Sequence, residues 1–318
     1  MTFTRYLVTG GAGFIGSHFV QDLLGPGSSP DIRVTVLDAL TYAGDTANLA
    51  PLAGDPRLRF VHGDITDAPL VRSLTNPGCA VVNFAAESHV DRSIADAGAF
   101  VRTNVTGTHV LLEAALAAGA GCFLQVSTDE VYGSIDHGSW TEDAPLAPNS
   151  PYAASKAAAD LLALSYTRTH GLDVRITRCS NNYGPRQHPE KLIPRFVTTL
   201  LAGGTVPLYG DGGNVRDWLH VSDHCRALRL VLERGRAGEV YNVGGGTQLS
   251  NREVTSRLLE ACGADWSSVR HVADRKGHDR RYCVNDGKLR GLGYRPRAGF
   301  EQGLARTVRW YADAAAAR

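Results

Sequence analysis

Short apolar segments alternate with longer helical segments through roughly the first 180 residues of the chain. The apolar segments carry hydrophobic residues at consecutive positions, which is typical of parallel strands that are covered on both faces. They are Tyr6–Thr9, Arg33–Leu37, Leu58–Val61, Ala80–Phe84, Cys122–Val126 and Val174–Thr177. The main helical segments are Phe14–Leu24, Ala99–Ala118 and Pro151–His170. This alternation predicts an α/β fold with a doubly wound parallel sheet, the Rossmann arrangement.

The pattern becomes looser after about residue 180, where glycines and prolines interrupt short elements. Ligand contacts concentrate on loops that a rigid scaffold carries. We therefore expect residues 1–178 to form the Rossmann domain and residues 179–318 to form mainly a smaller, C-terminal substrate-binding lobe. Parts of 217–245 are expected to pack back onto the Rossmann domain.

Composition and charge narrow the possible partners. The 318 residues are 43% hydrophobic, and 33 basic against 32 acidic side chains leave a net charge of +1, so no charge excess points to nucleic acid or a membrane surface. No apolar run approaches the roughly 18 residues of a membrane-spanning helix, and no secretory signal precedes the first strand. Six cysteines and eleven histidines lack metal-ligand spacing. We expect a soluble cytoplasmic protein that binds no nucleic acid, membrane or metal.

A glycine-rich turn joins the first predicted strand to the first helix. Gly10, Gly13 and Gly16 form a G-x-x-G-x-x-G pattern, whose backbone can approach a pyrophosphate at the helix N-terminus. Asp38 ends the second strand 22 residues later, close to the spacing at which a carboxylate accepts hydrogen bonds from a cofactor ribose. A carboxylate there repels a 2′-phosphate, so the pattern predicts NAD and not NADP. A solvated loop acid is the alternative interpretation of Asp38.

A tyrosine and a lysine lie four residues apart at the start of the last helix of this domain. Tyr152 and Lys156 therefore share one face of a helix, which Ser150 caps and Pro151 begins. A neighbouring ammonium favours the phenolate, which would lower the pKa of Tyr152 and make it a base toward a hydroxyl group. Lys156 is one of only four lysines among the 33 basic residues. A surface tyrosine packed on a lysine stem is the alternative, because helices also produce this spacing by chance.

Two adjacent acids follow a threonine at the end of the fifth predicted strand. Strand C-termini face the ligand crevice of such a sheet, which brings Thr128, Asp129 and Glu130 near Tyr152. Like charges in a dry cleft raise one pKa, so that one acid is protonated and the other ionised. This division suits an elimination, in which a proton leaves one carbon and a protonated hydroxyl leaves the next. A solvated Asp-Glu turn is the alternative.

Six further stretches carry a resemblance to known proteins. They are 84–93 (FAAESHVDRS), 103–108 (TNVTGT), 178–185 (RCSNNYGP), 189–194 (PEKLIP), 215–218 (VRDW) and 275–282 (RKGHDRRY). Together with the glycine loop and the Tyr152/Lys156 pair, they resemble the extended short-chain dehydrogenase/reductase superfamily and, within it, the dTDP-glucose 4,6-dehydratase family. The Thr-Asp-Glu triplet distinguishes this family from its relatives. Related decarboxylases and GDP-mannose dehydratases carry serine in place of Asp129, and 4-epimerases lack the acid pair.

The resemblance implies dehydration of dTDP-glucose to a 4-keto-6-deoxy sugar nucleotide, with NAD regenerated in each turnover and kept bound. Tyr152, aided by Thr128 and Lys156, would remove the 4-hydroxyl proton while the C4 hydride passes to NAD. Glu130 would then remove the C5 proton, and Asp129 would protonate the departing 6-hydroxyl before the hydride returns to C6. The resemblance also implies a homodimer.

Two sets of binding residues follow from position and from the resemblance. The cofactor set is Gly10, Gly13, Phe14, Ile15, Gly16, Asp38, Leu40, Thr41, Asp64, Ile65, Ala85, Ala86, Ser88, Asn104, Ser127, Tyr152, Lys156, Cys179 and Asn182. The substrate set is Ser88, Thr128, Asn181, Lys191, Leu192, Pro207, Tyr209, Arg216, Asn251, Arg275, His278 and Tyr282. Arg216, Arg275 and His278 are expected to hold a diphosphate, because arginine forks onto phosphate oxygens. An ion pair with Asp217 is the alternative for Arg216, and ordinary loop polarity is the alternative for most of the substrate set.

Two other functions stay open at this point. A UDP-sugar 4-epimerase would share NAD, Tyr152 and Lys156 but would release no water. A non-catalytic, NAD-dependent sensor or scaffold could use the same fold, since fold does not imply function. Thymidine or uridine as the preferred base, and cell-wall rhamnose or a natural-product sugar as the destination, are also left open.

Overall fold

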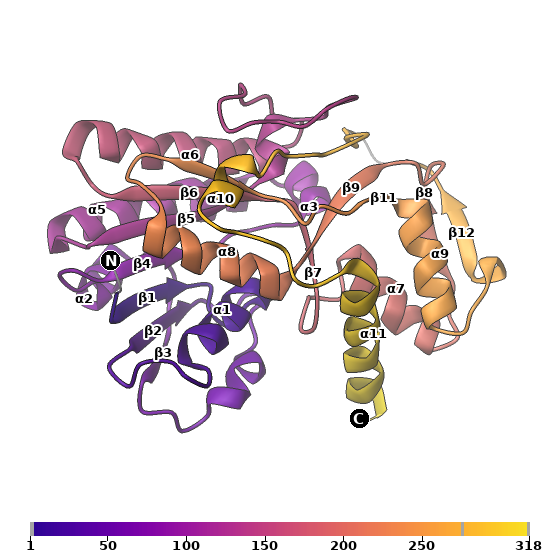
Figure 1. The fold of residues 1–318 in the computed structure, drawn as a ribbon, viewed down its shortest axis with the longest axis horizontal. Coiled ribbons are helices and arrows are strands. Elements are labelled where there is room, and N and C mark those ends of the chain that lie inside the picture. Colours follow the sequence, from indigo (N-terminus) through magenta and orange to yellow (C-terminus); the bar gives the residue numbers. More distant parts are fainter. Residues whose placement is uncertain (1–2, 275–276, 317–318) are drawn as a thin grey trace.

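A computed structural model describes residues 3–274 and 277–316, and a parallel sheet of seven strands forms its centre (Figure 1). The strand order is β10-β6-β5-β4-β1-β2-β3. The first six strands are β1 (Arg5–Thr9), β2 (Arg33–Asp38), β3 (Leu58–His62), β4 (Ala80–Asn83), β5 (Cys122–Thr128) and β6 (Val174–Cys179). Each coincides with a predicted apolar segment to within two residues at either end, and the doubly wound fold is confirmed.

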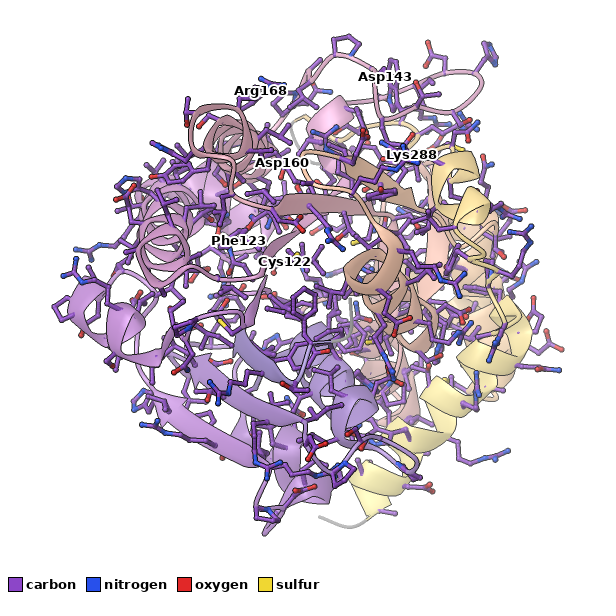
Figure 2. The ribbon with its side chains drawn as sticks, turned by 60° about the vertical axis from the view of Figure 1, so that its left-hand side comes forward. Cys122, Phe123, Asp143, Asp160, Arg168 and Lys288 are labelled. Atoms are coloured by element: carbon purple, nitrogen blue, oxygen red, sulfur yellow. The ribbon has the colours of Figure 1, made fainter. Side chains whose placement is uncertain are left out.

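Helices cover both faces of this sheet. On one face lie α1 (Phe14–Leu24) and α8 (Val221–Arg234), and on the other lie α2 (Ala68–Leu74), α5 (Thr108–Ala118) and α6 (Pro151–His170). Consecutive strand residues point to opposite faces. Cys122 therefore packs in the hydrophobic core under α1 and α8, and Phe123 packs in the core under α2, α5 and α6 (Figure 2). Because both faces are buried, the strands need apolar residues at consecutive positions.

The predicted helix over 99–118 is interrupted. It begins as α4 (Gly98–Phe100), continues as a π-helical turn over Val101–Gly107, and becomes α5 only at Thr108. Hydrophobic periodicity does not distinguish a wide turn of this kind from an ordinary helix, and such turns are frequent at functional sites. The other two helices, α1 and α6, begin and end at the predicted residues.

The C-terminal half forms a smaller lobe and also completes the main sheet. β10 (Val240–Val243) pairs with β6, and α8 covers one face of the sheet. The lobe itself contains β7 (Asn181–Tyr183), α7 (Leu192–Leu201), β8 (Val206–Tyr209), β9 (Val215–His220), β11 (Gln248–Ser250), α9 (Asn251–Ala261), β12 (Val269–Val272) and α11 (Phe300–Ala316). Figure 1 shows this lobe beside the carboxyl ends of the main strands.

The carboxyl ends of β1 and β4 form the topological switch point of the sheet. The two strands are neighbours, but β1 continues into α1 on one face, whereas β4 leads through α3 (Val90–Ala95) to α5 on the other. Ligands of open α/β sheets bind in the crevice that this divergence creates. Among the described helices, none combines the length and apolar content that crossing a membrane requires.

Candidate active site

The glycine loop after β1 leaves space at the N-terminus of α1. Gly10 has a φ of +67°, and a Cβ there would lie 2.7 Å from the Ala85 backbone nitrogen. A Cβ on Gly16 would lie 2.3 Å from the Gly10 carbonyl oxygen. Only glycine fits at either position. The bare backbone and the N–H groups of the helix end therefore suit the pyrophosphate of a dinucleotide.

Asp38 ends β2 beside this loop and is 8% exposed. Its Oδ2 accepts a hydrogen bond from the Ala12 N–H at 2.8 Å, and its Oδ1 accepts one from the Leu40 N–H at 2.9 Å. The carboxylate thus holds the glycine loop in place. Each oxygen retains a lone pair that a ribose hydroxyl could use, so the residues around the loop fit NAD.

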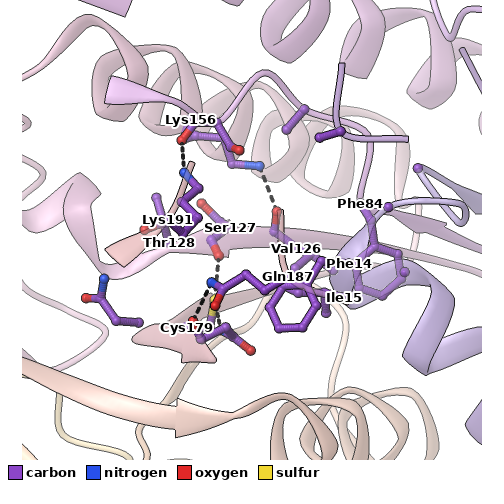
Figure 3. A pocket seen from close by; sticks show the side chains of 18 of the residues that line it. Phe14, Ile15, Phe84, Val126, Ser127, Thr128, Lys156, Cys179, Gln187 and Lys191 are labelled. Carbon is purple, nitrogen blue, oxygen red and sulfur yellow. Dashed lines mark hydrogen bonds between the residues drawn. The ribbon is translucent and has the colours of Figure 1, made fainter. Parts of the chain in front are cut away.

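Twelve residues of the predicted cofactor set line one cleft at the switch point. They are Gly10, Gly13, Phe14, Ile15, Gly16, Ala86, Ser88, Ser127, Tyr152, Lys156, Cys179 and Asn182 (Figure 3). The other seven are not among the residues that line it, namely Asp38, Leu40, Thr41, Asp64, Ile65, Ala85 and Asn104. Asn104 is instead bound within the protein, since its amide bonds both backbone groups of Glu87 (2.9 and 3.0 Å) and the Ser155 hydroxyl (2.8 Å). It holds the segment that follows β4.

Tyr152 and Lys156 lie at the base of this cleft on α6. The Ser150 hydroxyl accepts a hydrogen bond from the Ala153 N–H and fixes the start of the helix. Tyr152 is 9% exposed and Lys156 is 4% exposed. The Lys156 ammonium donates to the Val126 carbonyl at 2.7 Å, a bond drawn in Figure 3. Both residues are buried, so they do not form the surface pair, a tyrosine packed on a lysine stem, that was the alternative interpretation.

The expected lowering of the Tyr152 pKa is wrong for the protein alone. Burial raises that pKa well above its usual value, and the Glu130 carboxylate raises it further, while a hydrogen bond with Thr128 opposes the shift. The Lys156 ammonium is directed at a backbone carbonyl and does not offset the burial of the phenol. Sequence spacing shows that two groups share a helix face, but it does not show how much solvent they lose.

The acid pair also lies in this cleft, immediately after β5. The Thr128 hydroxyl accepts from the Glu130 N–H and donates to Asp129 Oδ1, both at 3.3 Å. Asp129 is 2% exposed. Burial raises its pKa well above the usual value, and the charges of Glu130 and Asp217 raise it further. The raised pKa favours the protonated form of Asp129, the form that can serve as a proton donor.

A second cleft adjoins the first on the side of the smaller lobe. It is lined by ten residues of the predicted substrate set, namely Ser88, Asn181, Lys191, Leu192, Pro207, Tyr209, Arg216, Asn251, His278 and Tyr282. Five residues line both clefts, which makes them continuous: Ser88, Glu130, Asn181, Glu190 and Lys191. Thr128 lines only the first cleft, and Arg275 lies outside the described residues.

The cationic groups of the second cleft are held by the chain around them. Arg216 is 5% exposed; it donates to the Asp279 carbonyl at 3.0 Å and lies 4.3 Å from the centre of the Tyr282 ring. The His278 ring lies 2.6 Å from the Asp274 carboxylate. A guanidinium and an imidazole in one cleft can bind phosphate oxygens.

Sequence reasoning missed several lining residues, of which Glu190 is the most informative. It lines both clefts and lies 3.8 Å from His89 Nε2 and from an Arg92 nitrogen. Its position in the 189–194 stretch, beside the predicted Lys191, was the available signal. Ala43 and Gln187 also line the first cleft, and nothing in their local sequence points to it.

Comparison with known proteins places the chain in a family. Residues 7–307 match the family described as GDP-mannose 4,6 dehydratase. A dTDP-glucose 4,6-dehydratase from Streptomyces griseus is 64% identical, over 97% of this chain and 94% of that protein. The chain belongs to the dTDP-glucose 4,6-dehydratase family. This family is part of the extended short-chain dehydrogenase/reductases, as the motifs predicted.

Solved structures separate this family from others with the same fold. DesIV, a dTDP-glucose 4,6-dehydratase from Streptomyces venezuelae crystallised with NAD and dTDP bound, is 67% identical, with a TM-score of 0.94 over 97% of each chain. A UDP-glucose 4-epimerase from Thermotoga maritima reaches a TM-score of 0.90 over 98% of this chain and 99% of that one, at 32% identity. The fold is thus common to dehydratases and epimerases, and sequence identity assigns this chain to the dehydratases.

Proposed function

We propose that this chain is an NAD-dependent enzyme of deoxysugar biosynthesis that converts dTDP-glucose to dTDP-4-keto-6-deoxyglucose. The observation that carries the proposal is the meeting of Thr128, Asp129 and Glu130 with Tyr152 and Lys156 in one cleft beside the glycine loop. Alcohol oxidation needs only the tyrosine and the lysine. Two further carboxyl groups suit an elimination, and family membership supports the same reaction.

The glycine loop, Asp38 and Lys156 would hold the cofactor across the switch point. Gly10 and Gly16 would accommodate the pyrophosphate, and Asp38 would accept a ribose hydroxyl. NAD held there would supply the acceptor for the C4 hydride and its source for C6, and its positive charge would favour the Tyr152 phenolate. Because NAD ends each turnover in its starting form, we infer that it stays bound.

Tyr152 begins the reaction by accepting the proton of the sugar 4-hydroxyl. Thr128, which shares a hydrogen bond with Tyr152, orients that hydroxyl. The Lys156 ammonium would add a positive charge that favours the ionised phenol, together with the positive charge of the bound cofactor, since Lys156 alone does not offset the burial. Burial keeps water away from these groups, so the charge acts in a medium of low dielectric constant.

The acid pair then carries out the loss of water. A ketone at C4 makes the C5 hydrogen acidic, and Glu130 accepts that proton. Asp129, whose pKa is raised by burial and by its like-charged neighbour, would donate a proton to the 6-hydroxyl as it leaves. Glu130 would return a proton to C5 as the hydride reaches C6. Each positioned acid or base contributes on the order of 10²–10⁴ in rate.

The second cleft would hold the nucleotide part of the substrate. Arg216 and His278 are the candidates for the diphosphate, and Arg275 joins them as a proposal from sequence. Asn251 and Tyr282 would flank the base and the sugar. On this division residues 1–178 bind the cofactor and 179–318 mainly bind the sugar nucleotide, with β10 and α8 as the parts that return to the main sheet.

A panel of sugar nucleotides, scored by product mass, tests the reaction. dTDP-glucose labelled with deuterium at C4 should lose one water and carry the deuterium to C6. An unchanged mass would favour a 4-epimerase and overturn the dehydration. Stoichiometric NAD without turnover of any sugar nucleotide would favour a non-catalytic sensor.

We also infer a cytoplasmic homodimer. Three large apolar side chains are exposed on neighbouring elements of the main domain: Ile94 (46%) on α3, Val101 (53%) on the π-helical turn and Leu161 (56%) on α6. Clustered exposed apolar groups mark interaction sites. The six cysteines are all free thiols, which suits a reducing compartment. Leu161→Arg should shift sedimentation toward the monomer, whereas Leu201→Arg, on α7 of the other lobe, should not.

A further inference from the structure

Lys156 is a cation in a buried position. It is 4% exposed, and its ammonium donates one 2.7 Å hydrogen bond to the Val126 carbonyl. Burial lowers its pKa, while Asp160 and Cys179 oppose that shift. A buried charge is costly unless an opposite charge compensates for it. The proposed role of Lys156 requires its charged form, so a nearby group must supply the negative charge that compensates for its burial.

Asp160 provides an anion one helical turn beyond Lys156. Residues four apart on a helix share a face. Asp160 lies on the buried side of α6 and has no exposed surface (0%) (Figure 2). Arg178 on β6 donates from Nε to Asp160 Oδ2 at 2.9 Å. The carboxylate is therefore bound to Arg178 on the adjacent strand, and it shares a helix face with Lys156, whose pKa its charge raises.

Arg178 is itself fixed by the next layer of side chains. It is 3% exposed and donates to the Tyr132 hydroxyl at 2.9 Å, with its guanidinium 4.8 Å from the centre of that ring. The Tyr132 hydroxyl donates in turn to Asn242 Oδ1 on β10 at 2.9 Å. A guanidinium does not lose its proton in proteins. Its charge and its hydrogen bond therefore favour the ionised form of Asp160 and oppose the burial that raises the pKa of that carboxyl.

The other titratable groups around Lys156 do not supply a lasting negative charge beside it. They are Tyr152 on α6, Cys179 on β6, and Asp129 and Glu130 after β5. Burial raises the pKa of Cys179 to about 12 and also raises the pKa values of Asp129 and Tyr152, and Tyr152 gains and loses a proton in each turnover under the proposed mechanism. Glu130 exchanges a proton in each turnover under the proposed mechanism. On the side of the π-helical turn, Asn104 contacts α6 through the uncharged Ser155.

We propose that Asp160, clamped by Arg178, is a positioning residue that keeps Lys156 protonated beneath the reacting centre. Neither Asp160 nor Arg178 is among the residues that line the two clefts, so both act through Lys156. The inference rests on the role proposed above for Lys156.

A second pair, between Arg175 on β6 and the partly buried Asp173 just before that strand, supplies a control. Arg175 is 5% exposed and donates to Asp173 Oδ2 at 2.6 Å. This pair lies at the N-terminal end of β6, whereas Asp160 and Arg178 lie near its C-terminal end. Breaking either pair leaves a buried guanidinium without its carboxylate, but only one of the two pairs adjoins Lys156.

The direct test is the titration of Lys156 followed by nuclear magnetic resonance. The chain has four lysines, at 156, 191, 276 and 288, so lysine labelled with ¹³C at Cε gives few signals, and Lys156→Arg assigns the relevant one. Asp160→Asn should lower the pKa of Lys156 by roughly 1–3 units, Asp160→Glu should restore much of it, and Asp173→Asn should leave it unchanged. The same Lys156 titration in Asp160→Asn as in the wild type would overturn the inference.

Two additions keep the test decisive. Asp160→Ser is measured alongside, with circular dichroism to select folded variants; an unchanged Lys156 pKa in a folded variant overturns the proposal. In Asp160→Asn the alkaline limb of the pH–rate profile should also move to lower pH, because Lys156 loses its charge earlier as pH rises. The lysine titration needs no turnover. A wild-type protein that releases no water would thus overturn the proposed function, while the titration still decides the inference about Asp160.

Discussion

The two adjoining clefts share five residues, but most of the remaining lining of each comes from a different part of the molecule. The groups proposed for the chemistry stand on two elements of the main domain, β5 with the turn that follows it and the first turns of α6. The second cleft draws mostly on α7, β8, β9, α9 and the segment that ends at Tyr282, together with residues 88–91 and Glu130 of the main domain. Reacting groups thus sit on rigid elements, while nucleotide contacts are distributed over a loop-rich lobe.

The difference suggests a division of energetic roles. Groups that act in the transition state need fixed geometry within about half an ångström, which packed strands and helices provide. Contacts with the distant nucleotide supply binding energy, and several partial contacts can share that task. We therefore expect substitutions in the first cleft to lower kcat and substitutions in the second to raise KM.

The largest effect is expected at Tyr152. Tyr152→Phe removes the proposed base, and kcat should fall by about 10⁴-fold. Single-turnover absorbance of reduced cofactor would measure the first step. Tyr166→Phe is the control, since Tyr166 lies further along α6 and its hydroxyl contacts Glu113 on α5. A loss smaller than tenfold in Tyr152→Phe would remove the tyrosine from the mechanism.

Substitutions in the acid pair should slow water loss more than they slow C4 oxidation. Asp129→Asn and Glu130→Gln should each slow water loss by about 10²- to 10³-fold and affect C4 oxidation less, so reduced cofactor accumulates. The proton donor is available below the raised pKa of Asp129, so wild-type water loss should decline as pH rises through that pKa, and Asp129→Asn should lack this limb. Abolished cofactor reduction with intact elimination would reverse the assigned roles.

The second cleft should respond in KM. Arg216→Met removes a charged donor, and such hydrogen bonds contribute about 1.5–3 kcal/mol, or roughly a 10- to 100-fold rise in KM with kcat nearly unchanged. Steady-state kinetics with dTDP-glucose would measure it. Arg280→Met is the control, because that side chain is 57% exposed and pairs with Asp211. A fall in kcat at constant KM would place Arg216 among the reacting groups.

The smallest expected effect concerns the glycine loop, on the cofactor side of the first cleft. Gly10→Ala should cost roughly 1–3 kcal/mol, because φ is +67° and the new Cβ would lie 2.7 Å from the Ala85 nitrogen. Gly27→Ala meets nothing within 4 Å at a φ of +79° and should cost less. Thermal denaturation and the NAD content of purified protein would compare them. Equal losses of stability and NAD would show that crowding at Gly10 does not matter.

Local signals predicted much of the main domain. The strands followed from consecutive apolar residues, and α6 followed from its cap at Ser150 and its end before Gly171. The π-helical turn around Asn104 was not predictable, because its wider hydrogen bonding leaves the hydrophobic pattern unchanged. Glu190 was missed as well, since its place at the junction of both clefts depends on how the lobe sits against the sheet.

The amino-acid sequence alone determined the positions of the strands, the glycine loop, the Tyr152/Lys156 spacing and the acid pair. Each of these features depends on residues that are close together in the chain. Tertiary structure decided the proton affinities: it buried Tyr152 so that its pKa rose when sequence reasoning expected a fall. Tertiary structure also bound Asp160, four residues from Lys156 on α6, to Arg178 on β6. Solvent exclusion and through-space charge depend on residues that only folding brings together.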